Sequence, residues 1–326
     1  MSGNAHAGHG NHAQAGLPGG LQVSERGYAL VPAGNPVEAG ARTDFRFRIT
    51  GPDGHPVTRY DVQHDKELHL IVARRDLSDF RHVHPVLGAD GTWTIPLTFA
   101  TAGDYRVFAD FAPSGDPAGP LTLGADVAVS GVYRPTPLPA ASRTAEVDGY
   151  TVVLDGDLSA ETGTVITLSV HKDGRPVTDL EPYLGAFGHL VALRLGDLAY
   201  LHVHPQGEPG DGVTPAGPGI GFHTQAPSTG TYRLYLDFQH DGVVRTAEFT
   251  VVVAPPEPTA HEAHTAHAGQ GDHQGHAGHA AHTNHAGLGG HENHAAHNTH
   301  AGHANHAGHE NHNDHANHAG HAGHRH

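Results

Sequence analysis

The sequence predicts an all-β fold of two tandem immunoglobulin-like β-sandwich domains, followed by a disordered tail rich in histidine. Three observations lead to this prediction: short strand patterns separated by turn signals, an internal repeat, and a change of composition at each end of the chain. The chain has 326 residues, which is enough for two domains of ordinary size. All of its Phe, Tyr and Trp residues lie between about residues 21 and 254, so only this part can build a core.

The composition of the chain predicts five segments. We expect a disordered His- and Gly-rich N-terminus over residues 1–20, a first sandwich over 21–130 and a second sandwich over 145–254. The segment 131–144 contains three prolines and is expected to be an extended linker. Residues 255–326 consist mostly of His, Ala, Gly and Asn and lack the large apolar residues that a core requires.

The two predicted sandwiches are copies of one repeat. The sequence Asp53–Thr58 recurs as Asp173–Thr178, and His82-Val83-His84-Pro85 recurs as His202-Val203-His204-Pro205, both at an offset of 120 residues. Further on, Tyr105–Phe111 matches Tyr232–Phe238 at an offset of 127, because the second copy has a longer loop around residues 206–219. A repeat of this kind indicates two similar structural units.

Each copy shows about seven strand patterns, as is typical of an immunoglobulin-like sandwich, although the Cys–Trp–Cys pattern of antibody domains is absent. Residues 44–50 alternate polar and apolar side chains, which predicts a half-buried strand, and Gly51–Gly54 predicts the turn that ends it. His240-Asp241-Gly242 predicts a hairpin turn. The other expected strands are 68–73, 80–84, 92–99, 105–111, 121–129, 150–154, 164–170, 189–195, 200–204, 221–224, 232–238 and 243–253.

The repeated histidines predict one metal site in each sandwich. Two histidines at positions i and i+2 of a strand point to the same face, where their imidazoles can bind one ion. The strand before each His-Val-His motif carries a third histidine, and a later strand carries an aspartate that could bind the ion or support a ligand. The predicted sites are His69, His82 and His84 with Asp110, and His189, His202 and His204 with Asp237. The alternative is that these histidines are structural and form hydrogen bonds between strands.

The remaining histidines of the body are weaker candidates for metal ligands. His55, His64, His171, His223 and His240 are not repeated between the copies, and we expect them at exposed turns or strand ends. His223 is the one that could still join the second site.

The tail predicts a flexible metal-binding segment. From His261 to His324 every third residue is histidine except at Gln270 and Leu288. Neighbouring imidazoles can chelate one ion in competition with protons. The first such candidates are His261, His264, His267, His273, His276 and His279. The alternatives are a solvated spacer or a polyelectrolyte that becomes cationic at low pH and associates weakly with anionic surfaces.

The composition restricts the chemistry and the partners of the protein. The chain has 35 His, no Cys and a formal net charge of -16 with neutral histidines, so its metal sites use imidazole and carboxylate ligands, which suit zinc, copper or nickel. The acidic excess argues against nucleic-acid binding. The sequence contains no stretch of 18 apolar residues, so we expect no integral membrane segment. The N-terminus shows no export signal, which predicts a cytoplasmic protein unless such a segment has been removed.

The body resembles an actinobacterial family of two-domain β-sandwich proteins with repeated His-Val-His-Pro motifs, described as secreted or membrane-associated. The resemblance is carried by residues 69–85 with Tyr105–Phe111, and by residues 189–205 with Tyr232–Phe238. It implies the fold and no particular activity. Members of that family usually begin with a membrane or export segment, from which this chain departs. The His-Val-His motif alone also looks like part of the copper site of copper/zinc superoxide dismutase.

These observations predict a protein that binds, buffers or delivers a divalent transition metal and whose partners are metal ions. The sequence has no Gly-x-Ser-x-Gly, P-loop or His-Glu-x-x-His motif, which argues against a hydrolase or a nucleotide-dependent enzyme. Two alternatives remain at this point. One is a copper- or zinc-dependent oxidoreductase that uses the His triads, and the other is a pH-dependent adhesive or structural module.

Overall fold

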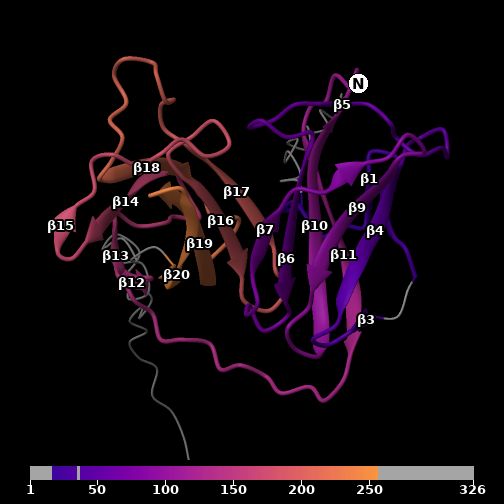
Figure 1. The fold of residues 1–326 in the computed structure, drawn as a ribbon, viewed down its shortest axis with the longest axis horizontal. Helices are drawn as coiled ribbons and strands as arrows, with labels where there is room; N and C mark the ends of the chain where they lie inside the picture. Colours follow the sequence, from indigo (N-terminus) through magenta and orange to yellow (C-terminus); the bar gives the residue numbers. More distant parts are fainter. Residues whose placement is uncertain (1–16, 35–36, 256–326) are drawn as a thin grey trace, which may run out of the picture. The chain divides into compact units, whose positions relative to one another are not determined.

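The computed structural model describes residues 17–34 and 37–255, where all regular secondary structure is β-strand (Figure 1). The strands form two groups, one on each side of an irregular segment over residues 131–143. The predicted all-β fold with two repeated domains is confirmed. In these described ranges, no helix has the length and hydropathy needed to cross a membrane. The disorder predicted for most of the N-terminus and for the tail falls on residues 1–16 and 256–326, outside the described residues.

The first domain is a sandwich of two sheets. One sheet has the strand order β1-β2-β4-β9-β8, and the other has the order β3-β11-β10-β6-β7 with the short β5 paired to β10. β3 pairs with β11 in parallel, and β6 pairs with both β10 and β7 antiparallel. The strands are β1 (Ser24–Glu25), β2 (Tyr28–Pro32), β3 (Val37–Glu38), β4 (Arg42–Thr50), β5 (Tyr60–Asp61), β6 (Leu68–Arg74), β7 (Arg81–Val83), β8 (Val86–Leu87), β9 (Thr92–Thr98), β10 (Gly103–Pro113) and β11 (Leu121–Ser130).

The strands of the second domain form one continuous hydrogen-bonded path. Their order is β12-β13-β14-β18-β17-β16-β19-β20, and β15 pairs with β14. β17 connects the two halves of this path, because it pairs with β16 along most of its length and with β18 at His204 and Pro205. The strands are β12 (Thr144–Val147), β13 (Tyr150–Asp155), β14 (Thr164–Lys172), β15 (Arg175–Pro176), β16 (His189–Arg194), β17 (Tyr200–Pro205), β18 (Gly219–Thr224), β19 (Gly230–His240) and β20 (Val243–Val253).

Every strand expected from the sequence is present, with ends that shift by a few residues. The predicted turn at His240-Asp241-Gly242 joins β19 to β20 as expected. The strands that the sequence patterns missed are mostly two-residue bridges, such as β3 and β5, which are too short to show a period. The longest of them is β2, a five-residue strand that ends in proline.

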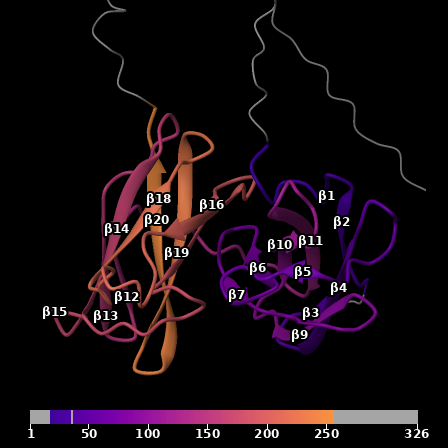
Figure 2. The ribbon, with the colours of Figure 1, turned by 90° about the horizontal axis from the view of Figure 1, so that it is seen from above.

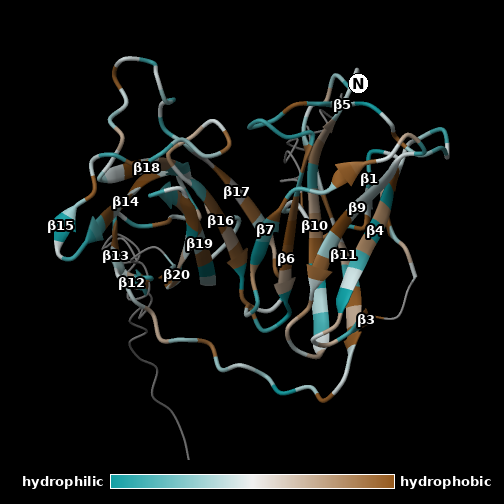
Figure 3. Ribbon diagram, viewed as in Figure 1, coloured by the Kyte–Doolittle hydropathy of each residue, from teal (hydrophilic) through white to brown (hydrophobic). Residues whose placement is uncertain are grey.

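Strand β6, which carries His69, is buried on both faces. Leu68, Leu70 and Val72 of β6 belong to the core of the first domain, and Ile71 and Ala73 point the other way into a separate cluster. That cluster also contains residues of the second domain, so it joins the two sandwiches. Its buried members, called the interdomain cluster below, are Ile71, Ala73, Leu77, Phe108, Val191, Leu193, Leu198, Tyr200 and Tyr235. Figure 3 shows the hydrophobic residues along β6 and β16.

Two segments outside the sheets also contact the first domain. Gly20, which the sequence analysis assigned to a disordered N-terminus, donates a hydrogen bond to the carbonyl oxygen of Thr122. The Gly20 carbonyl oxygen accepts a hydrogen bond of 2.7 Å from the buried guanidinium of Arg106. The segment 131–143 runs without strand or helix between the domains (Figures 1 and 2). It is held at Thr136, whose amide donates to Asp76 and whose hydroxyl accepts from Arg74.

Replacing Gly124 with alanine is expected to displace this N-terminal segment. A Cβ atom there would lie 2.0 Å from the Gly20 carbonyl oxygen and 2.8 Å from Nε of Arg106. Overpacking of this kind costs about 1–3 kcal/mol, which a urea unfolding curve can measure. The matched control is Gly163→Ala, where a Cβ would meet no atom within 4 Å, so its effect should stay within about 0.5 kcal/mol. Equal unfolding midpoints for the two variants would contradict this account.

Candidate metal centre

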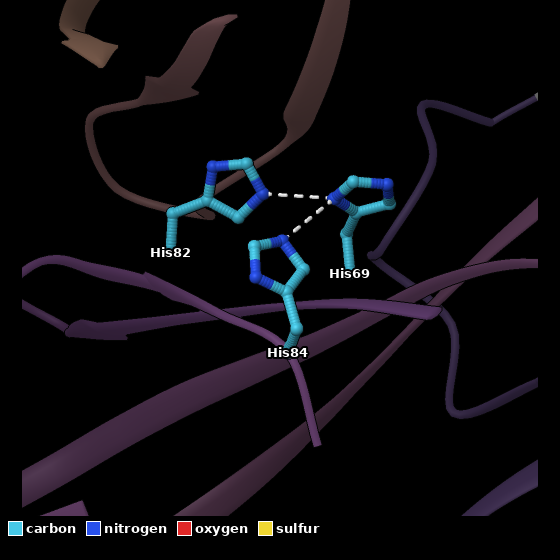
Figure 4. A group of neighbouring side chains, drawn as sticks. All are labelled: His69, His82 and His84. Atoms are coloured by element: carbon cyan, nitrogen blue, oxygen red, sulfur yellow. Dashed lines mark hydrogen bonds between the residues drawn. The ribbon is translucent and has the colours of Figure 1, made fainter. Parts of the chain in front are cut away.

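Three histidines of the first domain converge as the sequence predicts. His69 lies on β6, His82 lies on the adjacent strand β7, and His84 follows β7 by one residue. Nδ1 of His69 is 3.0 Å from Nε2 of His82 and 3.1 Å from Nε2 of His84 (Figure 4). Each ring offers one nitrogen to a common point, and these nitrogens lie within 4.8 Å of one another. The group could therefore hold a metal ion.

The tautomer of His69 is fixed by the main chain. Its Nε2 lies 2.9 Å from the carbonyl oxygen of Gln63. A carbonyl oxygen can only accept a hydrogen bond, so Nε2 carries the hydrogen. In the neutral ring Nδ1 then carries the lone pair, and this is the atom that faces His82 and His84.

His82 is oriented in the same manner by a carboxylate from the second domain. Its Nδ1 lies 2.8 Å from Oδ2 of Asp237, and both side chains are about 95% buried, with exposed fractions of 5% and 6%. The carboxylate accepts, so Nδ1 of His82 carries a hydrogen, and in the neutral ring Nε2 carries the lone pair. The other oxygen of Asp237 accepts a hydrogen bond of 2.6 Å from the Thr246 hydroxyl. This is the arrangement in which a carboxylate supports a metal-binding histidine.

When both rings are neutral, these hydrogen bonds leave lone pairs on His69 and His82 that face each other, an arrangement that a cation stabilises. Two neutral rings with their inner nitrogens unprotonated cannot form a hydrogen bond at 3.0 Å. Metal–nitrogen bonds of 2.0–2.1 Å in a tetrahedral site place ligand nitrogens about 3.3 Å apart, close to the observed spacings. Burial, and after it the neighbouring His82 and His69, lowers the pKa of His84 to about 2. Its ring is therefore neutral at pH 7, the state in which imidazole binds a metal.

Each aspartate lies opposite a histidine of the triad at which it was expected, and it also meets a partner in the other domain. The backbone of Asp110 pairs with that of His69, and the backbone of Asp237 pairs with that of His189. The carboxylate of Asp237 bonds to His82 of the first triad. Asp110 was expected at the first triad, and its carboxylate accepts hydrogen bonds from Tyr200 of the second domain at 3.3 Å and from Thr122 at 3.2 Å. The reason is that both aspartates point from the faces on which the two domains contact each other.

The second predicted site is described only in part. His189 lies on β16, is 2% exposed, and places its Nε2 2.8 Å from the carbonyl oxygen of Tyr183, as His69 does with Gln63. Burial is the largest cause that lowers the pKa of His189, to about 3. The backbones of His202 and His204 lie on β17, and their side chains are outside the described residues. The predicted tail ligands from His261 to His279 are outside them too.

Two further histidines differ from the sequence expectation. The ring centroid of His64 lies 5.5 Å from that of His189 and 6.2 Å from that of His69, so His64 lies beside one candidate ligand of each domain. Its counterpart in the second copy is leucine, so the repeat gave no signal for it. His240 was expected to be exposed, but it is buried and lies 2.7 Å from the Tyr150 hydroxyl.

A cavity of about 330 Å³ lies beside the triad. Its lining includes His64, His69, Asp110 and Glu25. His69 itself is 3% exposed, so this cavity provides space next to an otherwise enclosed ligand.

Several solved structures resemble this chain at low sequence identity. The Escherichia coli adhesin FdeC is 17% identical, with 71% of this chain and 65% of that chain covered and a TM-score of 0.23. Bovine butyrophilin is 9% identical, with 70% and 99% covered and a TM-score of 0.19. The FN1–FN3 domains of chicken CNTN1 are 11% identical, with 74% and 69% covered and a TM-score of 0.20. The match thus spans slightly less than two thirds of the adhesin chain, and likeness at this level carries no inference about function.

The family comparison matches both copies of the repeat. No curated protein matches the chain. A family model described as a domain of unknown function (DUF8832) matches residues 23–123 and again residues 145–255. These two segments correspond to the two sandwiches and together make up more than half of the chain. The chain therefore belongs to the DUF8832 family, and it carries two copies of that domain.

Proposed function

We propose that this protein binds a divalent transition metal ion through His69, His82 and His84, in a role of metal buffering or delivery. The observation that carries the proposal is the direction of the imidazole lone pairs. The Gln63 carbonyl and the Asp237 carboxylate fix the outer nitrogens of two rings as donors, so the inner nitrogens face each other at 3.0 Å.

The ligand set suits zinc, copper or nickel. All three metals accept neutral imidazole, and the buried carboxylate of Asp237 offsets part of the ion's charge through His82. Three protein ligands leave a coordination position for water or an exchangeable ligand. An exchangeable position is useful in a protein that releases its metal.

The proposal extends to a second site and to the tail. His189 is fixed by the Tyr183 carbonyl as His69 is by the Gln63 carbonyl, which supports the predicted set of His189, His202 and His204. The tail adds imidazoles three residues apart, to which we assign weaker binding and faster exchange because its sequence lacks the apolar residues that would build a core around them.

The proposal is tested by titrating Co²⁺ into the full-length protein after chelator treatment. We expect the wild type to show the intense visible bands of a low-coordinate cobalt site, and the His84→Ala variant to lose one equivalent of that signal per chain. His84 is the appropriate position because its ring is one of the three proposed ligands and does not bond to Asp237. The matched control is His55→Ala, which removes an exposed histidine. Identical titrations for the wild type and His84→Ala would overturn the proposal.

A further inference from the structure

The two domains contact each other through the same face of the repeat. Phe80 of the first domain stacks on Tyr235 of the second, with ring centroids 3.8 Å apart and planes inclined by 6°. Tyr200, the counterpart of Phe80, stacks on Phe108, the counterpart of Tyr235, at 5.3 Å and 28°. Each domain therefore supplies both halves of the contact, as in an interface with approximate two-fold symmetry.

The metal triad lies at the edge of this contact. Phe80 precedes His82 by two residues, and Tyr235 precedes Asp237 by two residues on one face of β19. The same strands that bring the aromatic rings together therefore bring His82 to Asp237. β7 has only three residues and lies at the edge of its sheet, where β6 is its one neighbour. The contact with the second domain therefore adds to the pairing with β6 that holds β7 in place.

We propose that metal binding at the triad and docking of the two domains are coupled, so that the bound ion holds the second domain against the first. This inference rests on the proposed function. All three ligands come from the first domain, and the second domain contributes Asp237, which contacts a ligand and not the ion. A cation on Nε2 of His82 makes its Nδ1–H a stronger donor to the Asp237 carboxylate, because charge-assisted hydrogen bonds are the stronger ones. The ion thus strengthens a bond that crosses the domain boundary.

The coupling must act in both directions. If the ion favours docking by a certain factor, docking favours the ion by the same factor. Asp237 is therefore a positioning residue, whose loss weakens binding without removal of a ligand. Loss of a carboxylate that supports a metal-binding histidine typically costs about 10–100-fold in metal affinity.

Hydrogen exchange of the full-length protein with and without zinc tests the coupling. We expect zinc to slow amide exchange in the wild type along the face of the second domain that contains Val191, Leu193 and Tyr235. His84→Ala should lose this effect, and its comparison with the wild type separates the triad from zinc bound elsewhere. Asp237→Asn should need about 10–100-fold more zinc to fill the triad, and zinc should then protect the first domain alone. Asp126→Asn, which alters an arginine-bonded carboxylate of the first domain, serves as the matched control and should behave as the wild type.

Two negative results have different meanings. If the cobalt signal shows a filled triad but zinc slows exchange in the second domain equally in the wild type and His84→Ala, the coupling is overturned and the metal site remains. If the wild type fills no triad, the proposed function is overturned and the coupling falls with it.

Discussion

The His82→Ala variant is expected to be less stable than the wild type without metal and to gain no stability from zinc at the triad. His82 has two roles, because its Nε2 faces the other ligands and its Nδ1 donates to Asp237. Removing the ring deprives the carboxylate of Asp237 of one hydrogen-bond partner, and Asp237 as a whole residue is only 4% exposed. A buried group deprived of its hydrogen bond costs about 1–3 kcal/mol. Urea unfolding after chelator treatment measures this first effect.

The second effect of His82→Ala appears when zinc is added. A ligand that binds only the folded state at 100 times its Kd stabilises that state by about 2.7 kcal/mol, and the variant should lose this increment. His84→Ala should lose the same increment with a smaller cost to the metal-free protein, since His84 does not bond to Asp237. Zinc bound elsewhere in the chain acts on the wild type and on both variants, so the difference in Tm between them reports on the triad. A zinc-dependent rise in Tm of His82→Ala equal to that of the wild type would exclude the triad as the site.

The sequence predicted the strands and the first triad because both depend on local spacing. Residues 44–50 alternate in burial as their polar and apolar pattern indicates, and β6 and β7 are joined by a short turn that makes them antiparallel neighbours. That pairing brings His69 to the His82–His84 pair. The repeat added weight to these histidines, since they recur at a constant offset while their neighbours differ.

The partners of the aspartates could not be predicted from spacing within one copy. Asp110 and Asp237 occupy equivalent positions in the two copies of the repeat. The contact between the domains decides which histidine or tyrosine each carboxylate bonds to. A signal for that contact was present in the run from Leu68 to Ala73. Its apolar residues occupy both faces of the strand, which is typical of a strand covered on both sides. His64 carried no comparable signal, because it lies in a turn and has no repeated counterpart.

The Tyr235→Ala variant is expected to separate the unfolding of the two domains. Tyr235 is 1% exposed, stacks on Phe80, and donates a hydrogen bond of 2.7 Å to the carbonyl oxygen of Leu77 in the first domain. Truncation of a buried aromatic side chain costs about 3–5 kcal/mol. This cost falls on the contact between the domains, because Tyr235 belongs to the interdomain cluster and not to the core of the second domain. We therefore expect calorimetry to resolve two transitions for Tyr235→Ala and one for the wild type.

Tyr232 offers the matched comparison, because it lies on the same strand with its ring in the core of the second domain. Tyr232→Ala should lower the stability of that domain itself and leave the docking face intact. Tyr235→Phe should keep the stack and lose about 1 kcal/mol through the missing hydroxyl. If Tyr235→Ala unfolds in a single transition at the wild-type Tm, the interdomain cluster does not hold the domains together. If it splits into two transitions and also binds zinc more weakly than Tyr232→Ala, the docking of the two domains and the metal site are parts of one cooperative unit.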